Sequence, residues 1–408
     1  MTTVVNLVAI KSRKLLGQLA YRKIPVSKVQ RRLVGRYALE PEIDLGDFTC
    51  RAVIDWISIR LWLGRETQHQ WLQRDVEAAL GERCYIEPLD KRSGGVSDLF
   101  EFRVQEPDLV KVRRLCRTFY GKYDLQMPPV VSEMEISVDF TPKHPGDLAR
   151  AQLFTALTRH FQPSRDVMGH RRDRPRFTFG RGANDTVGVI GRPRSGSGDK
   201  DHFLISSTTD RQAFVDATYY VGAEDSDMRW RIMDKVLDRQ NRAAGTSLVL
   251  GDKMKRVRIE VTLGRPEVAA LGIDFLDDLK GFRITRLQAK AFAFVLPTFL
   301  DPARARPSVR TAAHVWNDRQ RMEKFLNAGA IGLKAMDAAL DRRMKALRRA
   351  SQGDLAKKGL KLKAPPRIGV GSSGTFVSYE AMNERVGMAL RHLRERVAAA
   401  FSVPDKDL

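Results

Sequence analysis

Three stretches of the sequence place acidic residues among the apolar residues of an expected strand. They are Asp55 in VIDWISI, Glu135 and Asp139 in EISVDF, and Glu260 in RIEVTL. A buried carboxylate is costly unless it is paired or bound to a metal. Glu135 and Asp139 are four residues apart and share one face of a strand. If the strands bring these carboxylates together, their oxygens suit Mg²⁺ or Mn²⁺, hard ions that polarise a phosphate. A solvated strand face explains any one of them alone, whereas three such strands favour the cluster.

Two adjacent tyrosines, Tyr219 and Tyr220, are the best candidates for a nucleophile. A tyrosine that attacks a phosphodiester forms a phosphotyrosine link, which keeps the bond energy for rejoining. Neighbouring residues of a strand point to opposite faces. We therefore expect Tyr220 at the site and Tyr219 in the core, where replacement by phenylalanine costs stability. Packing alone is the competing explanation for both rings. The motifs GxSxG, HxH and HExxH do not occur, and the seven histidines are scattered.

The charge of the chain points to a polyanionic partner. The 408 residues include 71 Lys+Arg and 49 Asp+Glu, a net charge of +22. Such a field concentrates nucleic acid around the protein. A basic protein without that partner and a basic membrane-surface protein are the alternatives, but no strongly amphipathic, aromatic-rich helix supports the second. No apolar run reaches the ~18 residues of a membrane helix, so we expect no membrane contact.

The three cysteines, Cys50, Cys84 and Cys116, are widely spaced and form no CxxC motif. This pattern is typical of neither a disulfide scaffold nor a zinc ribbon, and it fits a reducing cytoplasm. We therefore expect a cytoplasmic protein.

Composition divides the chain into three parts. We expect a basic N-terminal arm over 1–48, an α+β domain over 49–295, and a basic helical tail over 296–408. Within the arm, residues 11–23 fit an amphipathic helix. Within the tail, a Pro/Gly/Ser-rich stretch near 351–377 predicts a flexible linker.

The tail carries over half of the excess positive charge. Residues 304–367 contain 17 Lys/Arg and five Asp/Glu. Residues 314–350 have a helical pattern, and a final helix is expected over 378–401 with Ser378 as its N-cap. If these cations contact phosphates, they contribute to the salt dependence of nucleic-acid binding.

The expected elements of the central domain alternate between strands and helices. Strands are predicted over 50–63, 84–89, 98–104, 134–140, 176–180, 186–191, 202–206, 217–222, 228–235 and 255–263. Helices are predicted over 66–80, 108–123 and 144–161.

Four pieces of this domain, in their order, resemble the replication initiation factor family of rolling-circle plasmids, filamentous phages and integrative elements. They are IDWISIRL (54–61), EISVDF (135–140), TYYVGAEDSDMRWRIMDK (218–235) and RIEVTL (258–263). The third follows the pattern T-x-Y-[IV]-G-x-x-x-S-x-x-x-x-R-[IV]-x-D-K. The resemblance covers roughly residues 50–265. It implies a nickase-like α+β core with a mixed or antiparallel sheet and flanking helices.

The resemblance also implies an activity. Family members nick one strand of a replication origin through a tyrosine, with a divalent metal held by carboxylates, and keep the 5′ phosphate as a tyrosyl adduct. The usual tyrosine position is Met233 here. Either Tyr220, or with less support Tyr219, has taken over the attack, or the chain binds origin DNA without nicking it. Arg231 and Lys235 would neutralise charge on the phosphate.

The expected partners follow from the same resemblance. They are origin DNA in a hairpin or supercoiled form and a host helicase, and the chain could act as a homodimer. A third possibility, argued from charge alone, is a structural protein that coats RNA or DNA.

Overall fold

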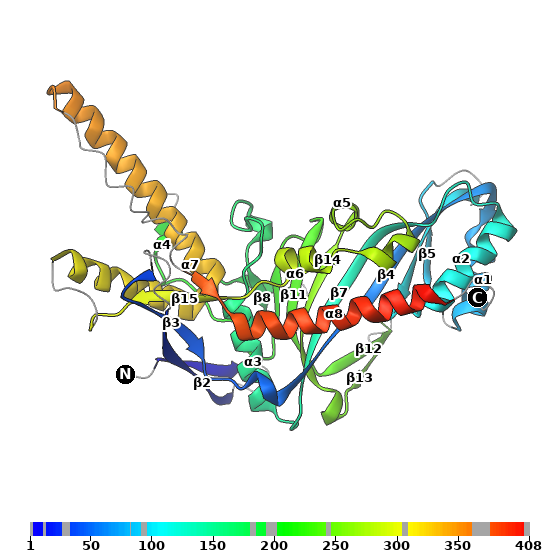
Figure 1. Ribbon diagram of the computed structural model, residues 1–408, viewed down its shortest axis with the longest axis horizontal. Helices are drawn as coiled ribbons and strands as arrows, with labels where there is room; N and C mark the ends of the chain where they lie inside the picture. Colours follow the sequence, from blue (N-terminus) through cyan, green and yellow to red (C-terminus); the bar gives the residue numbers. More distant parts are fainter. Residues whose placement is uncertain are drawn as a thin grey trace.

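The structure is a computed structural model. The residues that it describes are 3–10, 14–26, 33–81, 83–90, 96–179, 185–192, 202–241, 246–303, 309–360 and 376–403. A large sheet occupies the middle of an elongated molecule, a smaller sheet lies at the end that holds the N-terminus, and a helical pair lies at the other end (Figure 1). None of the described helices combines the length and apolar composition that a bilayer crossing requires.

The large sheet has nine strands, and every neighbouring pair is antiparallel. Their order across the sheet is β5-β6-β4-β7-β14-β11-β10-β8-β9. The strands are β4 (Phe48–Gln68), β5 (Tyr85–Pro88), β6 (Val96–Gln105), β7 (Val130–Pro142), β8 (Arg176–Thr178), β9 (Thr186–Gly188), β10 (Thr218–Val221), β11 (Met228–Lys235) and β14 (Arg256–Leu263). This sheet, with its flanking helices, confirms the predicted α+β class.

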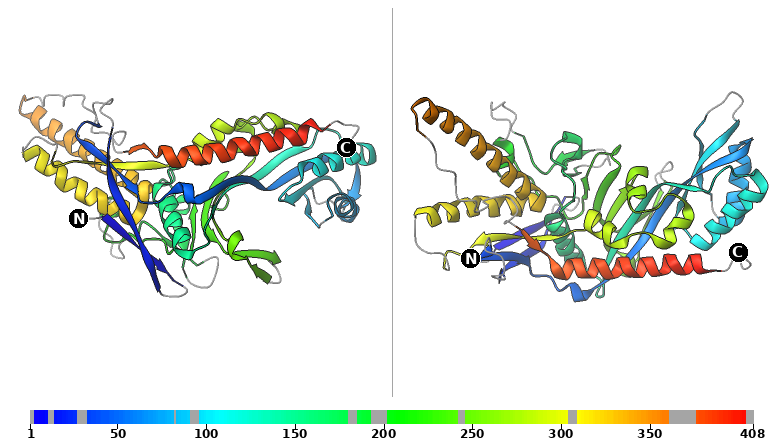
Figure 2. Two further views of the ribbon diagram at one scale, coloured as in Figure 1. Left: turned by 60° about the horizontal axis from the view of Figure 1, so that its bottom comes forward. Right: turned by 45° about the horizontal axis from the view of Figure 1, so that its top comes forward.

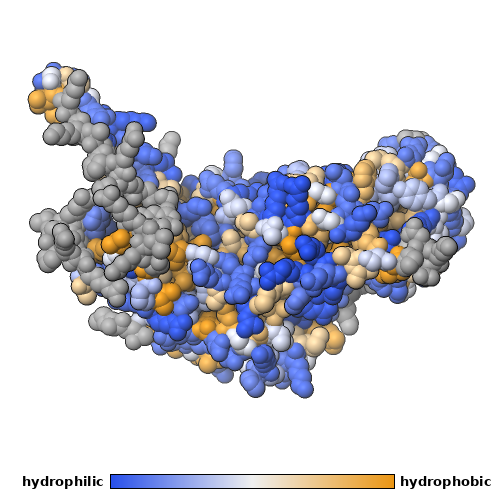
Figure 3. Space-filling view, in the orientation of Figure 1, coloured by the Kyte–Doolittle hydropathy of each residue, from blue (hydrophilic) through white to orange (hydrophobic). Residues whose placement is uncertain are grey.

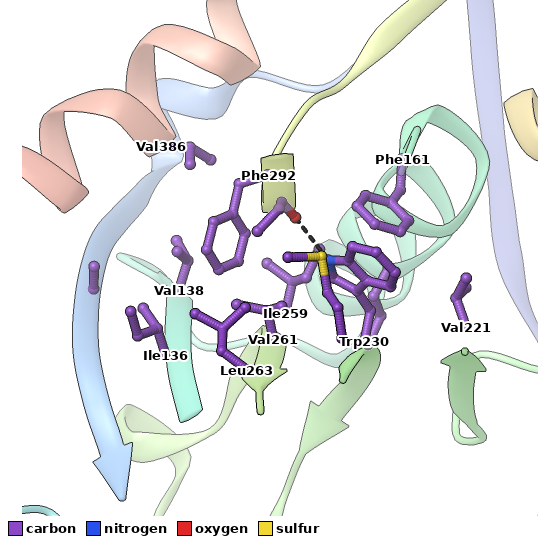
Figure 4. Packing of buried hydrophobic residues seen from close by; sticks show 14 of the residues in the cluster. Ile136, Val138, Phe161, Val221, Trp230, Ile259, Val261, Leu263, Phe292 and Val386 are labelled. Carbon is purple, nitrogen blue, oxygen red and sulfur yellow. Dashed lines mark hydrogen bonds between the residues drawn. The ribbon is translucent and has the colours of Figure 1, made fainter. Parts of the chain in front are cut away.

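Alternation along the strands gives the large sheet two different faces. In β14, Ile259, Val261 and Leu263 are fully buried on one face. Figure 4 shows them beside Phe292, and it shows the indole Nε1 of Trp230 donating a hydrogen bond to the Ala291 carbonyl at 2.9 Å. The other face carries polar and charged side chains, and we call it the polar face.

Helices cover the apolar face (Figure 2). They are α3 (Asp147–His160), α5 (Arg265–Ala270), α6 (Ile284–Ala291) and α8 (Glu380–Ser402). In the left view of Figure 2, α8 lies above the sheet, and the hairpin of β12 (Leu237–Asn241) and β13 (Thr246–Val249) lies below it. Two further helices, α1 (His69–Leu80) and α2 (Leu109–Tyr123), pack together at the far end. The helices predicted over 66–80, 108–123 and 144–161 are thereby confirmed, with small shifts at their ends.

The N-terminal region is part of a second sheet. Its five strands, in the order β1-β2-β3-β15-β16, are β1 (Thr3–Ala9), β2 (Lys14–Pro25), β3 (Arg36–Pro41), β15 (Val295–Leu300) and β16 (Phe376–Ser378). The amphipathic helix expected over 11–23 is wrong for the described residues of that range, which form β2. Leu19 and Tyr21 are buried on one side of β2. Pairing with β1 therefore outweighs a spacing that also fitted a helix.

The C-terminal region is not a separate tail. Strand β15 pairs with β3, and α8 packs against β4, α2 and α6. The helix predicted over 314–350 is confirmed as part of α7 (Val309–Lys357). Lys324 anchors this helix, because its buried Nζ lies 2.8 Å from Asp210 Oδ2.

The coloured residues on the face of the molecule shown in Figure 3 are largely hydrophilic.

Three local predictions are corrected. The strand expected over 202–206 is the short helix α4 (His202–Ile205). Helix α8 begins at Glu380, with Tyr379 at the N-cap position in place of Ser378. Of the linker expected near 351–377, residues 351–357 belong to α7, and 361–375 lie outside the described residues. Short 3-10 turns complete the fold at Leu45–Asp47, Arg171–Asp173, Asp252–Met254 and Leu276–Gly281.

Candidate functional site

A β-bulge in β4 aims one carboxylate at the polar face. The register with β7 shifts between Ile54 and Trp56, so Asp55 is an extra residue in this strand. A bulge of this kind re-aims side chains. Carboxylate oxygens of Asp55, Glu135 and Glu260 lie within 4.8 Å of one another. Three strands that are neighbours in the sheet thus bring together three of the four predicted acids.

Asp139, the fourth acid, has a different environment. It shares the polar face of β7 with Glu135, as expected, but it is not part of the three-carboxylate group. Arg258 donates to both of its oxygens, from Nε at 2.5 Å and from Nη2 at 2.7 Å. Arg256 adds a third ion pair at 2.9 Å. Because guanidiniums occupy both oxygens, we drop Asp139 from the expected metal ligands.

Arg258 connects Asp139 to the carboxylate group. Its side chain is almost completely buried, and Nη1 donates to Asp55 and lies 3.4 Å from Glu260. A buried charge needs such partners, since its desolvation is expensive. Burial lowers the pKa of Arg258, but Asp139, Asp55 and Glu260 outweigh it and raise that pKa overall. The guanidinium is therefore a permanent cation among these carboxylates.

Arg231 is the second cation of the group. Its Nε donates to Glu260, and its Nη2 lies 3.6 Å from Glu135 Oε1. Burial lowers its pKa, but Glu260 and then Glu135 outweigh it, so the pKa is raised. About 40% of the Arg231 side chain remains exposed. Its guanidinium can thus contact both the carboxylates and a ligand outside them.

Of the three carboxylates, Glu135 has a buried oxygen that lacks a hydrogen bond to any described residue. Thr262 Oγ1 donates to its Oε2 at 2.6 Å, whereas its buried Oε1 has no hydrogen-bond partner among the described residues. Burial, followed by the negative charge of Glu260, raises the pKa of Glu135 to about 7, against the opposing effects of Arg231 and Thr262. An oxygen with these properties is suited to receive a cation or to hold a proton.

The donor set fits a hard divalent ion. All three side chains offer carboxylate oxygens, which Mg²⁺ and Mn²⁺ prefer. Four carboxylates, Asp139 included, face the guanidiniums of Arg231, Arg256 and Arg258. When Glu135 is ionised, one negative charge is therefore left over among these groups, and it is available for an added cation.

The two tyrosines lie on opposite faces of β10, as the sequence predicted. Strands β10 and β11 form the expected hairpin, in which Tyr220 pairs with Arg231 and Thr218 with Met233. Tyr219 is buried in the core. The Tyr220 ring lies on the polar face, with the Arg176 guanidinium 5.4 Å from its centroid.

A cavity of about 530 Å³ opens beside the carboxylates. Its lining includes Glu135, Tyr220, Arg231, Met233 and Lys235. Met233 therefore lines the same cavity as the carboxylates and Tyr220. Every residue expected to carry chemistry, except Tyr219 and Asp139, borders this cavity.

Other residues of the 218–235 pattern hold the local backbone. Gly222 has a φ of 91°, and a Cβ there would lie 2.9 Å from the Met228 carbonyl oxygen, so the turn requires glycine. Ser226 donates to Asp173 at 2.9 Å, which ties this turn to the 3-10 segment Arg171–Asp173. Asp234 accepts a hydrogen bond from Arg150 of α3 at 2.8 Å. The pattern thus combines structural positions with positions that face the cavity.

The sequence interpretation missed two contributors. Arg258 was part of the quoted RIEVTL piece but received no role, although Arg256, Arg258 and Glu260 alternate at the period of a strand. Trp56 lines the cavity and stacks under Arg103, whose guanidinium lies 3.8 Å from the ring centroid. Its place depends on the bulge at Asp55, which no residue pattern in this stretch indicates.

Comparison with known proteins adds little. No protein-family model and no curated protein matches the sequence. Among solved structures, an aspartate kinase from Synechocystis aligns with 72% of this chain at 10% identity and a TM-score of 0.16, and the match spans 55% of the kinase. A similarity this weak supports no statement about fold or activity.

Proposed function

We propose that the chain is a rolling-circle replication initiator that binds origin DNA and cleaves one strand with a divalent metal. The observation that carries the proposal is one cavity that joins a buried carboxylate group to a tyrosine, Tyr220. The net charge of +22 favours a nucleic-acid substrate. The sequence resemblance over roughly 50–265 supplies the reaction type.

Each residue has a role in the proposed cleavage. Asp55, Glu135 and Glu260 would hold Mg²⁺ or Mn²⁺, which polarises the scissile phosphate when bound. Tyr220 attacks phosphorus, so that a Tyr–O–P bond forms while the P–O3′ bond breaks. The phenol proton is transferred, in net terms, to the departing 3′ oxygen. Arg231 and Lys235 line the same cavity and neutralise charge on the phosphate.

A second candidate function is origin binding without cleavage. Met233 favours it, because this side chain borders the cavity at the family's tyrosine position and cannot attack a phosphate. On this alternative, the carboxylates and arginines would be retained for DNA binding or regulation. The two functions differ in one product, a covalent protein–DNA adduct.

The test is to trap that adduct. An origin-containing supercoiled plasmid is incubated with the protein and Mn²⁺, and the adduct is detected by denaturing electrophoresis. We expect Tyr220→Phe to lose the adduct. Tyr219→Phe is the matched control, since it removes a hydroxyl from the opposite face of the same strand, and it should keep the adduct.

Two further variants separate the alternatives. Glu135→Gln should lose cleavage while DNA binding persists. Met233→Tyr restores a phenol at the family's usual position. An adduct with Met233→Tyr but not with the unaltered protein would favour the non-cleaving alternative with an intact metal site. If neither protein forms an adduct with Mg²⁺ or Mn²⁺, the cleavage proposal is wrong.

A further inference from the structure

A second cavity, of about 500 Å³, lies away from the carboxylates. It is formed by the loop that follows α3, by α4 and by the second half of α7. Its lining includes five cationic side chains and one carboxylate, Asp166. The cations are Arg165, Arg174, Arg192, Lys334 and Arg342. Its charge balance is thus the reverse of that in the carboxylate group.

An aromatic ring holds two of these cations close together. The guanidiniums of Arg192 and Arg174 lie 4.7 Å and 5.2 Å from the ring centroid of Phe203 in α4. The Nε of Arg174 donates to the Met168 carbonyl at 3.0 Å, which fixes its direction. Two like charges are therefore kept near each other by stacking and by the backbone.

Crowding raises the electrostatic cost of this arrangement. Burial lowers the pKa of Arg174, and the nearby charges of Arg192 and Arg171 lower it further, while Asp166 acts in the opposite direction. The Arg165 guanidinium pairs with Asp173 through Nη2 at 3.2 Å, whereas its buried Nε has no hydrogen-bond partner among the described residues. An anion between these groups would relieve the repulsion and supply hydrogen-bond acceptors.

A break in α7 places its cations at this cavity. Gly329 has a φ of 66°, and a Cβ there would lie 2.9 Å from both Cα and the carbonyl oxygen of Arg159 in α3. The break at Gly329, where no Cβ intervenes, lets α7 pack closely against the end of α3. Lys334, Ala338 and Arg342 then follow one another on a single side of the helix.

We propose that this cavity binds a nucleotide through its phosphate. Guanidiniums bind phosphate oxygens in pairs, which suits two arginines held by one ring. The volume falls within the ~300–1,000 Å³ of small-molecule sites and far exceeds a bare phosphate ion. Apolar lining from Phe203, Leu204 and Ile331 provides a surface for a base or sugar.

The phosphate has two possible sources: a free nucleotide or one nucleotide of a DNA strand. The DNA source rests on the proposed function, whereas the free nucleotide does not. Lys345 and Arg349 are exposed, and their spacing continues the side of α7 that carries Arg342. This part of α7 projects from the body of the molecule (Figure 1). A strand leaving the cavity would meet these cations.

Two probes distinguish the sources. Binding of ATP is measured by calorimetry, and binding of a 5′-phosphorylated single-stranded oligodeoxynucleotide by fluorescence anisotropy, both with the full chain. The double variant Arg174→Gln/Arg192→Gln should lower the affinity for the relevant probe at least about tenfold. This is the size expected for lost charge-assisted hydrogen bonds. Phe203→Leu keeps an apolar side chain but removes the ring, and it should weaken binding of the same probe.

The matched control is Lys111→Gln/Lys280→Gln, which removes the same charge from exposed positions outside the cavity. We expect it to bind each probe within about twofold of the unaltered protein. Thermal unfolding checks each variant. If the double variant does not fold, Arg192→Gln alone replaces it, because Arg192 is exposed.

The outcomes are distinct. Loss of ATP binding assigns a free nucleotide, and loss of oligonucleotide binding alone assigns a DNA strand. Equal weakening in the control pair, or no binding of either probe, would overturn the proposal. None of these results depends on adduct formation, so the cleavage proposal can fail separately.

Discussion

The two faces of the large sheet are built by the same strands, and both have buried residues in the central strands β7 and β14, but their chemistry is opposite. In β7 and β14, Ile136, Val138 and Ile259 are fully buried on the apolar face. One residue away, Glu135 and Arg258 are 6% and 1% exposed on the polar face. The contrast arises because successive side chains of a strand point to opposite faces of the sheet.

The two faces contribute differently to the stability of the fold. Burial of the apolar face stabilises the fold by roughly 25 cal/mol per Å² of apolar surface. A buried ion cluster contributes little net stability, because the desolvation of each charge offsets the attraction between them. The polar face is therefore poorly explained by stability, and a ligand that uses its charges is the better explanation.

The largest expected effect comes from removing the central cation. Arg258→Met leaves Asp139, Asp55 and Glu260 without their shared partner. We expect a loss of ~3–5 kcal/mol in the free energy of unfolding near neutral pH, as for other broken buried pairs. Urea unfolding measures it.

The control for that change is Arg229→Gln. Arg229 pairs with Glu133 at 3.0 Å on the same face, but both side chains are partly exposed. Its loss should lower the free energy of unfolding by less than ~1 kcal/mol. Equal losses in the two variants would show that Arg258 is not the centre of a buried cluster.

The second prediction uses pH. The pKa of Glu135 is raised from 4.5 in the unfolded chain to about 7 in the fold. Between these values the folded state binds more protons, so the free energy of unfolding should fall as pH rises from 4.5 to about 7. Glu135→Gln should lose this slope. Asp210, whose pKa is raised to about 6, gives a slope of the same sign in both proteins and cancels in their difference.

Added divalent ion should change the free energy of unfolding of the unaltered protein and of Glu135→Gln by different amounts. Above this pH range, Mg²⁺ or Mn²⁺ at 100 times its Kd should stabilise the unaltered protein by ~2.7 kcal/mol. Glu135→Gln should gain much less, because it loses a ligand. Equal stabilisation of both proteins would mean that the ion binds elsewhere and that the carboxylate group has a structural role.

How much of this arrangement follows from the sequence depends on the range of the interactions. Alternation in EISVDF and RIEVTL predicted which side chains share a face, and the adjacent tyrosines separated as expected. These are local properties of a strand. Arg258 as the partner of Asp139 was not predicted, because it requires the pairing of β7 with β14, which are far apart in the chain.

The terminal regions show the same limit. Residues 14–23 fit a helix in isolation, and pairing with β1 makes them a strand. The supposed tail joins the core because β15 pairs with β3 and α8 covers the apolar face. The basic cavity depends on a backbone break at Gly329, and neither composition nor periodicity identifies such a break. It also brings together the loop after α3, α4 and α7, which are distant in sequence.

The smallest expected effect concerns the two faces of β10, and it differs from the expectation drawn from the sequence. Tyr219→Phe was expected to cost stability. However, the buried Tyr219 hydroxyl has no hydrogen-bond partner among the described residues. Removing a buried, unpaired hydroxyl removes the free-energy cost of its desolvation. We therefore expect a stabilisation between zero and ~1 kcal/mol in urea unfolding.

Tyr123→Phe is the control, because the Tyr123 hydroxyl donates to Asp75 at 2.7 Å, and its loss should cost ~1 kcal/mol. Equal destabilisation in both variants would indicate that the Tyr219 hydroxyl is paired, and the two faces of β10 would then be less different than the structure implies.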